Sequence, residues 1–332
     1  MPDSGSDPES EWGPIPGLTP KRNGTRDAFV TGMLASLPRP SPRIAIVRNP
    51  RSGSAPEASE LARVAGASQV TVTVADVPEG AASTPWLERV VADFDVVVAA
   101  GGDGTVSTVA AAVARAGKAL AILPTGTLNH FARDMGIPID LEKAAAVIAA
   151  GHERKVDLGV VNERIFLNNV SFGNYPRMVH EREALERDGR SHALATTIAI
   201  ARTWWHLRKL AVVLTIDNGK TVVRRSPFIV VGNGSYTLSG LALGRREHIS
   251  DGQLSLYVAP SMGRLGALWL PIRALAGTLE RHEQFETFCA STINAVFAHR
   301  TMTAAIDGEV AELTSPLEIA IRRKVLRVIT PA

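Results

Sequence analysis

The residues whose types and spacing could carry out chemistry lie first between Val96 and Thr108, where the sequence reads VVVAAGGDGTVST. The apolar start of this stretch predicts a strand buried on both faces, and Thr105 to Ala116 predicts a helix that begins where the glycines end. Gly101, Gly102 and Gly104 let the backbone approach a ligand closely, and the N–H groups of a helix's first turn favour anions. The stretch therefore fits a phosphate group.

Asp103 is the informative residue of this stretch. A carboxylate among N–H groups repels a phosphate unless a cation lies between them or the carboxylate serves as a base. The alternative is an ordinary Gly-Asp-Gly turn in which Asp103 caps the helix. A short glycine motif alone does not decide between the two interpretations.

A second set of polar residues follows the next predicted strand, Ala119 to Leu123, where the sequence reads PTGTLNHFA. Two parallel strands joined by one helix place the loops at their carboxyl ends on the same edge of the sheet. We therefore expect Thr125, Thr127 and Asn129 to lie beside the glycine loop.

In this order, the two motifs resemble the catalytic domain of the diacylglycerol kinase and sphingosine kinase superfamily, in particular its soluble bacterial lipid kinases. The first motif alone is shared with NAD kinases and resembles phosphofructokinases, so the ordered pair is the more specific signal. The resemblance extends from about Ile44 to the C-terminus. It implies ATP as phosphoryl donor, Mg²⁺ as metal and a lipid alcohol as acceptor.

The resemblance also implies three nucleotide-binding loops. The first, an Asn-Pro followed by a Ser-Gly, is from its residues alone only a strand-to-helix turn. The implied nucleotide-binding residues are Asn49, Pro50, Ser52 and Gly53; Gly101, Gly102, Asp103, Gly104, Thr105, Val106 and Ser107; and Thr125, Gly126, Thr127 and Asn129.

Two later acidic motifs complete the resemblance. Asp251-Gly252 resembles the family's Asp-Gly turn, which holds a structural Mg²⁺ through the carboxylate of Asp251 and the backbone carbonyls of His248 and Gln253. Oxygen ligands of this kind suit a hard cation. The alternative is a plain Asp-Gly turn before a strand.

Asp307-Gly308-Glu309 resembles the family's late Asp-Gly-Glu motif, which is assigned to catalysis. On a strand the two acids would share one face, whereas the glycine permits a turn instead. A carboxylate facing the γ-phosphate can position an acceptor hydroxyl and receive its proton. We predict Asp307 as the base, supported by Glu309 and with the reverse left open, and Asp103 as the residue that orders Mg²⁺ or water.

The elements that position these residues fall into two groups. Strands and helices alternate from Ile44 to Ala150, which predicts a doubly wound parallel sheet. The resemblance implies that this sheet is of NAD-kinase-like type. After Arg154 successive strands and hairpins predict an antiparallel β-sandwich. We predict a disordered tail over residues 1–40, a first domain over 41–153 and a second over 154–332. The resemblance implies that the first binds ATP and the second the lipid substrate, with the active site in the cleft between them. The last segment could pack back on the first domain.

Composition limits the remaining choices. The 332 residues are 45% apolar, enough for two cores, and Cys289 is the only cysteine, so an intrachain disulfide is excluded. A net charge of +3 with a pI near 9.2 does not indicate nucleic acid as a partner. No apolar run is long enough to span a bilayer and no signal peptide is evident, so we expect a cytoplasmic protein, peripheral on the inner face of the membrane. Whether the protein forms a homodimer is left open by the sequence.

Apolar stretches with tryptophan and basic residues suggest how the protein could reach a membrane. Ser191 to Leu210 predicts a helix that carries Trp204 and Trp205 beside basic residues, and Leu265 to Leu279 is a second such stretch. Tryptophan beside basic residues suits an anionic membrane surface. The alternative is that these helices cover the sandwich with their tryptophans in the core.

The sequence departs from the family pattern at three places. Ser107 stands where Asn is usual, His130 stands where Asp is usual, and Arg245-Arg246 precede the Asp-Gly turn where many members have Pro-x-Ala. The two arginines could contact an anionic headgroup or lie in solvent. We predict an ATP-dependent kinase for diacylglycerol or a related lipid alcohol, in phospholipid biosynthesis. The alternatives are an NAD-kinase-type enzyme with a soluble substrate and a catalytically silent nucleotide or lipid sensor.

Overall fold

The computed structural model describes residues 42–50, 56–66, 72–78, 83–239, 242–248, 251–260 and 285–332. The chain divides into Met1–Ser41 and a compact unit, Pro42–Ala332, and the description below concerns the second. The predicted tail, Ser52 and Gly53 of the first predicted loop, and the apolar stretch Leu265 to Leu279 lie outside the described residues.

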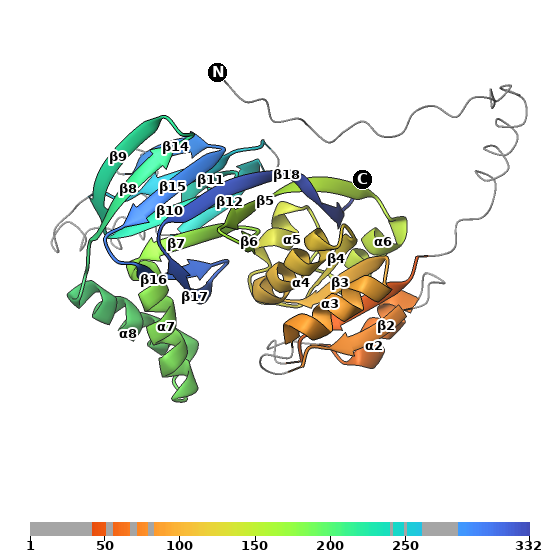
Figure 1. Cartoon of the computed structure of the whole chain (residues 1–332). Coiled ribbons are helices and arrows are strands. Elements are labelled where there is room, and N and C mark those ends of the chain that lie inside the picture. The colour runs from red at the N-terminus through yellow and green to blue at the C-terminus, as the bar shows by residue number, and fades with distance from the viewer. Residues whose placement is uncertain are drawn as a thin grey trace, which may run out of the picture. The chain divides into compact units, whose positions relative to one another are not determined.

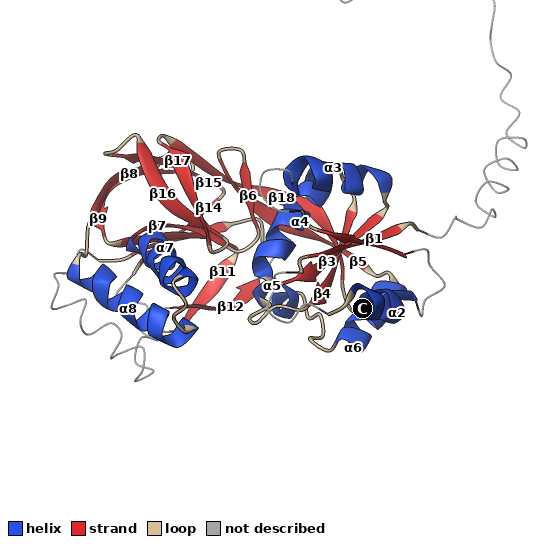
Figure 2. Ribbon diagram, turned by 90° about the horizontal axis from the view of Figure 1, so that it is seen from below, coloured by secondary structure: helices blue, strands red, loops and turns tan. Residues whose placement is uncertain are grey.

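The first half of this unit alternates strands and helices, as its apolar pattern predicts (Figure 1). Figure 2 shows α3 and α4 on one side of the parallel strands and α2 and α6 on the other, which is a doubly wound arrangement. The elements are β1 (Ile44–Arg48), α2 (Ala58–Gly66), β2 (Val72–Asp76), α3 (Ser83–Asp93), β3 (Val96–Gly101), α4 (Asp103–Arg115), β4 (Ala119–Pro124), α5 (His130–Asp134) and α6 (Leu141–Ala150).

The strands that carry the predicted phosphate loops are buried along their whole length, which is why they read as continuous apolar runs. They pair in parallel, with Gly101 opposite Pro124, so that both loops leave the same edge of the sheet. α4 begins at Asp103, two residues earlier than the sequence predicts.

The second half consists mainly of antiparallel strands, with two helices inserted after β7. Its elements are β5 (Glu153–Val161), β6 (Arg164–Phe166), β7 (Asn169–Gly173), α7 (Asn174–Arg187), α8 (His192–Trp205), β8 (Leu210–Ile216), β9 (Lys220–Ser226), β10 (Phe228–Asn233), β11 (Ser235–Ser239), β12 (Ala242–His248), β13 (Leu254–Val258), β14 (Glu286–Ala290), β15 (Thr292–Phe297), β16 (Thr301–Ile306), β17 (Glu309–Thr314) and β18 (Leu317–Ile329).

Within the described residues, strands of both halves form two large sheets, and β11 and β12 form a separate two-stranded sheet. The ten-stranded sheet runs β2-β1-β3-β4-β18-β15-β8-β9, with β5 paired to β18 and β6, and the six-stranded sheet runs β14-β13-β10-β7-β16-β17. One core cluster contains buried side chains from both sheets, among them Phe172, Leu214, Ile229 and Ile293, so the sheets enclose a sandwich core. The apolar stretch from Arg164 to Phe172 forms two strands, β6 and β7, which are interrupted at Leu167 and Asn168.

β18 joins the two halves. It pairs in parallel with β4 through Arg327 and Val328, and antiparallel with β5 and β15. Its early residues Leu317 and Ile319 belong to the sandwich core, whereas Leu326 belongs to the core of the first half. The domain boundary at residues 153–154 stays a prediction. Among the described residues, none of the helices has both the length and the apolar character needed to cross a bilayer.

Candidate active site

The glycine loop passes directly into the first turn of α4. The N-cap residue is Gly102, and no side chain supplies a capping hydrogen bond at that position. A Cβ atom at Gly101 would lie 2.5 Å from the Cβ atom of Thr105, so only glycine fits the turn as it stands. The loop thus combines close backbone packing with an uncapped helix N-terminus, the geometry that suits a phosphate.

Asp103 is the first residue of α4 and does not cap this helix. Its Oδ1 instead accepts the backbone N–H of Phe131 at 3.2 Å, in the first turn of α5. The interpretation of Asp103 as a cap of its own helix is therefore wrong. The carboxylate ties the glycine loop to the loop that follows β4.

The second loop touches the first through two glycines. A Cβ atom at Gly126 would lie 2.3 Å from the Cα atom of Gly102 and 2.9 Å from Oδ1 of Asn129. Asn129 adopts a left-handed conformation with φ 52°, and its Oδ1 accepts the Gly126 N–H at 3.0 Å while its Nδ2 donates to the Gly126 carbonyl at 2.6 Å. Thr125 is buried and Thr127 is exposed in the same loop.

The first predicted loop is linked to the glycine loop by Asn49. Its Nδ2 donates to Oγ1 of Thr105 at 3.4 Å, and its backbone N–H donates to the carbonyl of Ala100 at 3.3 Å. Pro50 is exposed in the turn that follows. The described parts of all three predicted loops thus lie at the carboxyl edge of the parallel strands.

Asp307 lies in the turn between β16 and β17, with φ 49° at Asp307 and 89° at Gly308. Its carboxylate accepts four hydrogen bonds: Ser107 Oγ donates at 2.5 Å, and the backbone N–H groups of Leu167, Asn168 and Asn169 donate at 2.7, 2.7 and 3.1 Å. Ser107 belongs to α4. The turn is therefore fixed to the helix of the glycine loop on one side and to the β6–β7 connection on the other.

Two opposed effects act on the carboxyl group of Asp307. Burial raises its pKa above the ordinary value because the charged form loses hydration, and the hydrogen bonds from Ser107 and the three backbone N–H groups lower it. Burial is the larger effect, so the pKa is raised.

Glu309 approaches the glycine loop from the same turn. Its Oε1 lies 2.7 Å from the point where a Cβ atom on Gly104 would be. The pKa of Glu309 is raised, first because neighbouring atoms displace water from its carboxyl and second by the negative charges of Asp307 and Glu183. The residue as a whole stays exposed, so water offsets part of this effect. Of the two geometries open from the sequence, a shared strand face or a turn, the structure has the turn.

The predicted metal turn is held by a residue that sequence reasoning missed. Asp157 is buried, and its two oxygens accept the N–H groups of Gly252 at 2.9 Å and Lys324 at 2.7 Å. Asp251 is exposed, and the carbonyl of Gln253 accepts the Gly234 N–H at 3.0 Å. An acid within the apolar run KVDLGVV is the signal that could have pointed to Asp157.

His248 ends β12, and its side chain, like those of Arg245 and Arg246, is outside the description. Over the described part of the chain, no three His, Cys, Asp or Glu side chains gather as metal ligands would. A site made of one carboxylate and backbone carbonyls would not form such a group. The Gln253 carbonyl keeps a second lone pair beside its hydrogen bond, so these oxygens are compatible with a hard cation.

Comparisons with known proteins agree with this architecture. The family model described as diacylglycerol kinase catalytic domain matches residues 43–161, and the one described as YegS C-terminal NAD kinase beta sandwich-like domain matches residues 170–330. Over 146 residues the chain is 35% identical to a Bacillus subtilis (strain 168) protein named diacylglycerol kinase, covering 42% of this chain and 48% of that protein. A Staphylococcus saprophyticus protein of the same name is 33% identical over 147 residues, again with 48% of that protein covered. The chain thus matches about half the length of these curated relatives.

Solved structures share the fold. A diacylglycerol kinase from Bacillus anthracis str. Sterne aligns with a TM-score of 0.63 at 19% identity, covering 88% of this chain and 98% of that one. An NAD kinase from Archaeoglobus fulgidus in complex with ATP aligns with a TM-score of 0.50 at 14% identity, covering 87% and 93%. The predicted fold class, an NAD-kinase-like α/β part followed by an antiparallel sandwich, is confirmed. The chain thus matches a diacylglycerol kinase catalytic domain over residues 43–161, followed by a YegS-type NAD kinase beta sandwich-like domain over residues 170–330.

Proposed function

We propose that the protein transfers the γ-phosphoryl group of ATP to the hydroxyl group of diacylglycerol or a related lipid alcohol. The observation that carries this proposal is the contact between the Asp307–Glu309 turn and the N-terminal part of α4, where Ser107 Oγ donates to Asp307 and Glu309 lies against Gly104. Two carboxyl groups are thereby set beside a loop whose geometry suits phosphate. Phosphoryl transfer needs this combination of positioning and charge.

The nucleotide would bind across the glycine loop and the loop after β4. The uncapped N-terminus of α4 offers N–H groups to phosphate oxygens, and the contact between Gly102 and Gly126 keeps both loops close to the ligand. A bound Mg²⁺ would neutralise charge that develops on the phosphate oxygens. Asp103 would help to hold it through Oδ2, because Oδ1 already accepts the N–H of Phe131. Asp251 and the carbonyls of His248 and Gln253 stay the proposed ligands of a second, structural Mg²⁺.

We assign the proton acceptor to Glu309 rather than to Asp307, the base that the sequence favours. The carboxylate of Asp307 is occupied by four hydrogen bonds and holds α4, the β6–β7 connection and the turn together. Glu309 is exposed and lies beside the glycine loop. An acceptor hydroxyl can reach Glu309 without breaking a structural hydrogen bond, so Asp307 acts as a positioning residue.

The assignment of a lipid acceptor draws on the relatives named diacylglycerol kinase. The reaction would then belong to phospholipid biosynthesis and take place where a peripheral protein meets the cytoplasmic face of the membrane. The fold similarity to NAD kinase leaves a soluble nucleotide as the competing acceptor, and the departures at Ser107 and His130 leave a catalytically silent sensor as the other alternative.

The test is transfer of labelled phosphate from γ-labelled ATP to diacylglycerol, monoacylglycerol, sphingosine, ceramide and phosphatidylglycerol in mixed micelles, with NAD in a parallel reaction. Glu309→Gln and Asp103→Asn serve as site variants, and the latter keeps an oxygen that can accept the Phe131 N–H. Glu312→Gln is the matched control, since Glu312 lies on the same strand as Glu309 and points to its other face.

We expect one labelled lipid class, with labelling lost in both site variants and kept in Glu312→Gln. Labelled NAD, or lipid labelling that persists in Glu309→Gln, would overturn the assignment. ATP binding with no labelled acceptor in the whole panel would favour the sensor.

A further inference from the structure

The outward face of α8 is apolar where the exposed face of a helix is normally polar. Leu194, Ile198, Ala201 and Trp205 recur at intervals of four, three and four residues, which places them on one stripe about 16 Å long. The side chain of Leu194 is 50% exposed and that of Trp205 is 74% exposed. The alternative interpretation, in which Trp204 and Trp205 lie in the core, is therefore wrong for Trp205. The side chain of Trp204 lies outside the description.

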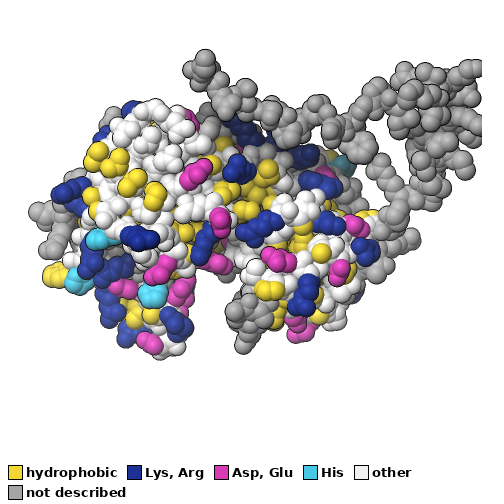
Figure 3. Space-filling view, in the orientation of Figure 1, with side chains coloured by type: hydrophobic (Ala, Val, Ile, Leu, Met, Phe, Trp, Pro, Cys, Tyr) yellow, Lys and Arg dark blue, Asp and Glu magenta, His cyan; other side chains and the backbone are white. Residues whose placement is uncertain are grey.

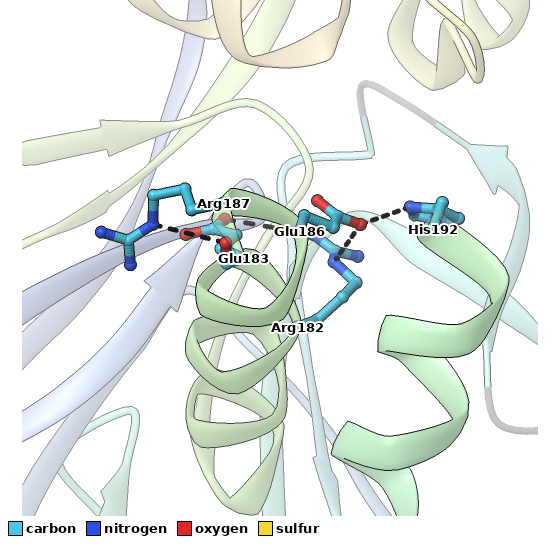
Figure 4. A network of polar contacts seen from close by, with 5 residues as sticks. All are labelled: Arg182, Glu183, Glu186, Arg187 and His192. Carbon is cyan, nitrogen blue, oxygen red and sulfur yellow. Dashed lines mark hydrogen bonds and ion pairs between the residues drawn. The ribbon is translucent and has the colours of Figure 1, made fainter. Parts of the chain in front are cut away.

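The opposite face of α8 is the one that packs against the protein. Ala195, Ala199 and Thr203 are buried there, about half a turn away from the apolar stripe, and α8 contacts α7. His192 lies on the same side, and its Nδ1 is 2.6 Å from Oε1 of Glu186 on α7 (Figure 4). With its inner face already packed, α8 leaves the apolar stripe available to a partner.

The charge around this stripe selects the kind of partner. From Gly189 to Leu210 the chain has four Lys or Arg residues and no Asp or Glu. These residues are Arg190, Arg202, Arg208 and Lys209, all exposed. Figure 3 shows apolar, basic and histidine side chains over the lower left part of the molecule, where Figure 1 places α7 and α8. Acidic side chains lie among them there, and α7 carries Glu181, Glu183 and Glu186. An exposed apolar stripe with basic neighbours and a tryptophan matches the surface of a bilayer that contains anionic lipid.

We propose that the apolar stripe of α8 docks onto a bilayer containing anionic phospholipid, with Trp205 and Leu194 entering the headgroup region and Arg202 contacting lipid phosphates. This inference rests on the proposed function for its use, since it would bring the site to a lipid substrate. α7 connects the two regions: its Glu186 contacts His192 of α8, and its Glu183 acts on the pKa of Glu309.

Flotation of the full-length protein with vesicles tests the docking without any catalysis. Vesicles of phosphatidylcholine alone are compared with vesicles that also contain phosphatidylglycerol, at low and at high salt. The variants are Leu194→Ser/Trp205→Ser, which removes apolar surface, and Arg202→Glu, which reverses one charge. Val223→Ser is the matched control, because Val223 is 66% exposed and lies on β9 rather than on α8. Circular dichroism and melting temperature establish that each variant is folded.

We expect the wild-type protein and Val223→Ser to bind the anionic vesicles, and salt to weaken this binding. The double variant should bind at least about tenfold more weakly because two large apolar side chains no longer leave water. Arg202→Glu should lose roughly tenfold on anionic vesicles only. The proposal is overturned if the wild type binds both vesicle types equally or not at all, or if neither variant binds more weakly than the control. Should the double variant not fold, Arg202→Glu decides.

The two proposals fail in different ways. If no acceptor is phosphorylated but vesicle binding depends on α8, the proposed function is wrong and the docking surface stands. If the lipid kinase activity is present and both variants bind vesicles as strongly as the wild type, only the proposed docking surface is wrong.

Discussion

Asp307 and Glu309 are separated by one glycine, yet their carboxyl groups have different surroundings. Asp307 accepts hydrogen bonds from two segments that are far apart in the sequence, α4 and the β6–β7 connection, whereas Glu309 faces the glycine loop from an exposed position. The first arrangement suits holding a structure together, and the second suits exchanging a proton.

Substituting each acid by its amide should separate these roles. Asp307→Asn replaces an accepting oxygen by an N–H donor that faces other donors, so the free energy of unfolding should fall by about 2 kcal/mol. Glu309→Gln should leave stability within about 0.5 kcal/mol and lower kcat by about a hundredfold or more. Urea unfolding and steady-state kinetics on the identified acceptor measure both quantities.

Glu312→Gln serves as the control for both assays and should match the wild type. If Asp307→Asn kept full stability and lost only kcat, Asp307 would be the base after all and our assignment would be reversed.

The raised pKa of Glu309 gives a pH signature. A base must be deprotonated, so kcat/KM should fall as pH drops through the pKa of Glu309, at a higher pH than for an ordinary glutamate. Glu183→Gln removes a negative charge that raises this pKa, so the acidic limb of the profile should move to lower pH. Glu312→Gln, whose charge is not among the causes of the shift, should leave the limb in place. An unmoved limb in Glu183→Gln would argue against Glu309 as the titrating group.

Sequence patterns point to these acids but not to the different surroundings of their carboxyl groups. Spacing and resemblance point to Asp103, Asp307 and Glu309 because such acids recur at fixed offsets from glycines. The carboxylate oxygens of Asp307 accept hydrogen bonds from the backbone N–H groups of residues 167–169, which lie about 140 positions earlier in the chain. No local pattern encodes a contact at that separation.

At the scale of elements, the close packing of the glycine loop against the loop after β4 requires glycine at position 126 more strictly than at position 102. A Cβ atom at Gly126 would lie 2.3 Å from backbone of Gly102, whereas a Cβ atom at Gly102 would lie 3.4 Å from Gly126. Backbone cannot move aside as a flexible side chain does.

Gly126→Ala should therefore lower the free energy of unfolding by about 1–3 kcal/mol and weaken ATP binding, because the loops must separate. Gly102→Ala should cost less than about 1 kcal/mol without nucleotide, since its contact is ordinary packing. Thermal unfolding in the absence of ATP compares the two variants directly. Equal losses in both would mean that the loops do not touch as described.

Elements with a simple pattern are predicted, and elements with a mixed pattern are not. β3 and β4 are continuous apolar runs, and α6 lies between its cap residue Asp140 and Gly151 in the left-handed conformation, both of them residue types that mark helix ends. α7 is rich in charge and has few buried apolar residues, so its helical period is hidden. The alternation along β18 breaks at Lys324, which has φ 53° at the shift in its pairing with β5.

At the scale of the whole compact unit, β18 makes the two cores dependent on each other. Leu326 is buried in the core of the first half, on the same strand whose Leu317 and Ile319 lie in the sandwich core. A substitution at one end of β18 should therefore destabilise a sheet to which both cores contribute.

Leu326→Ala should lower the free energy of unfolding by about 2–5 kcal/mol, as for other buried leucines. The neighbouring Val325 is 44% exposed, and Val325→Ala should cost less than about 0.5 kcal/mol. Melting curves followed by tryptophan fluorescence and by circular dichroism should coincide in each variant, because the shared sheet couples the cores. Two separate transitions in Leu326→Ala would show that the halves unfold independently.

The position of β18 in the chain also matters while the protein is being made. β4 leaves the ribosome well before the strand that will lie next to it, since β18 follows every other strand of that sheet. Until then the growing chain exposes a wholly apolar strand whose outer edge has unpaired N–H and C=O groups, a site that recruits other chains. A nascent or nicked chain without β18 is thus prone to aggregate, which makes it a substrate for chaperones and proteases.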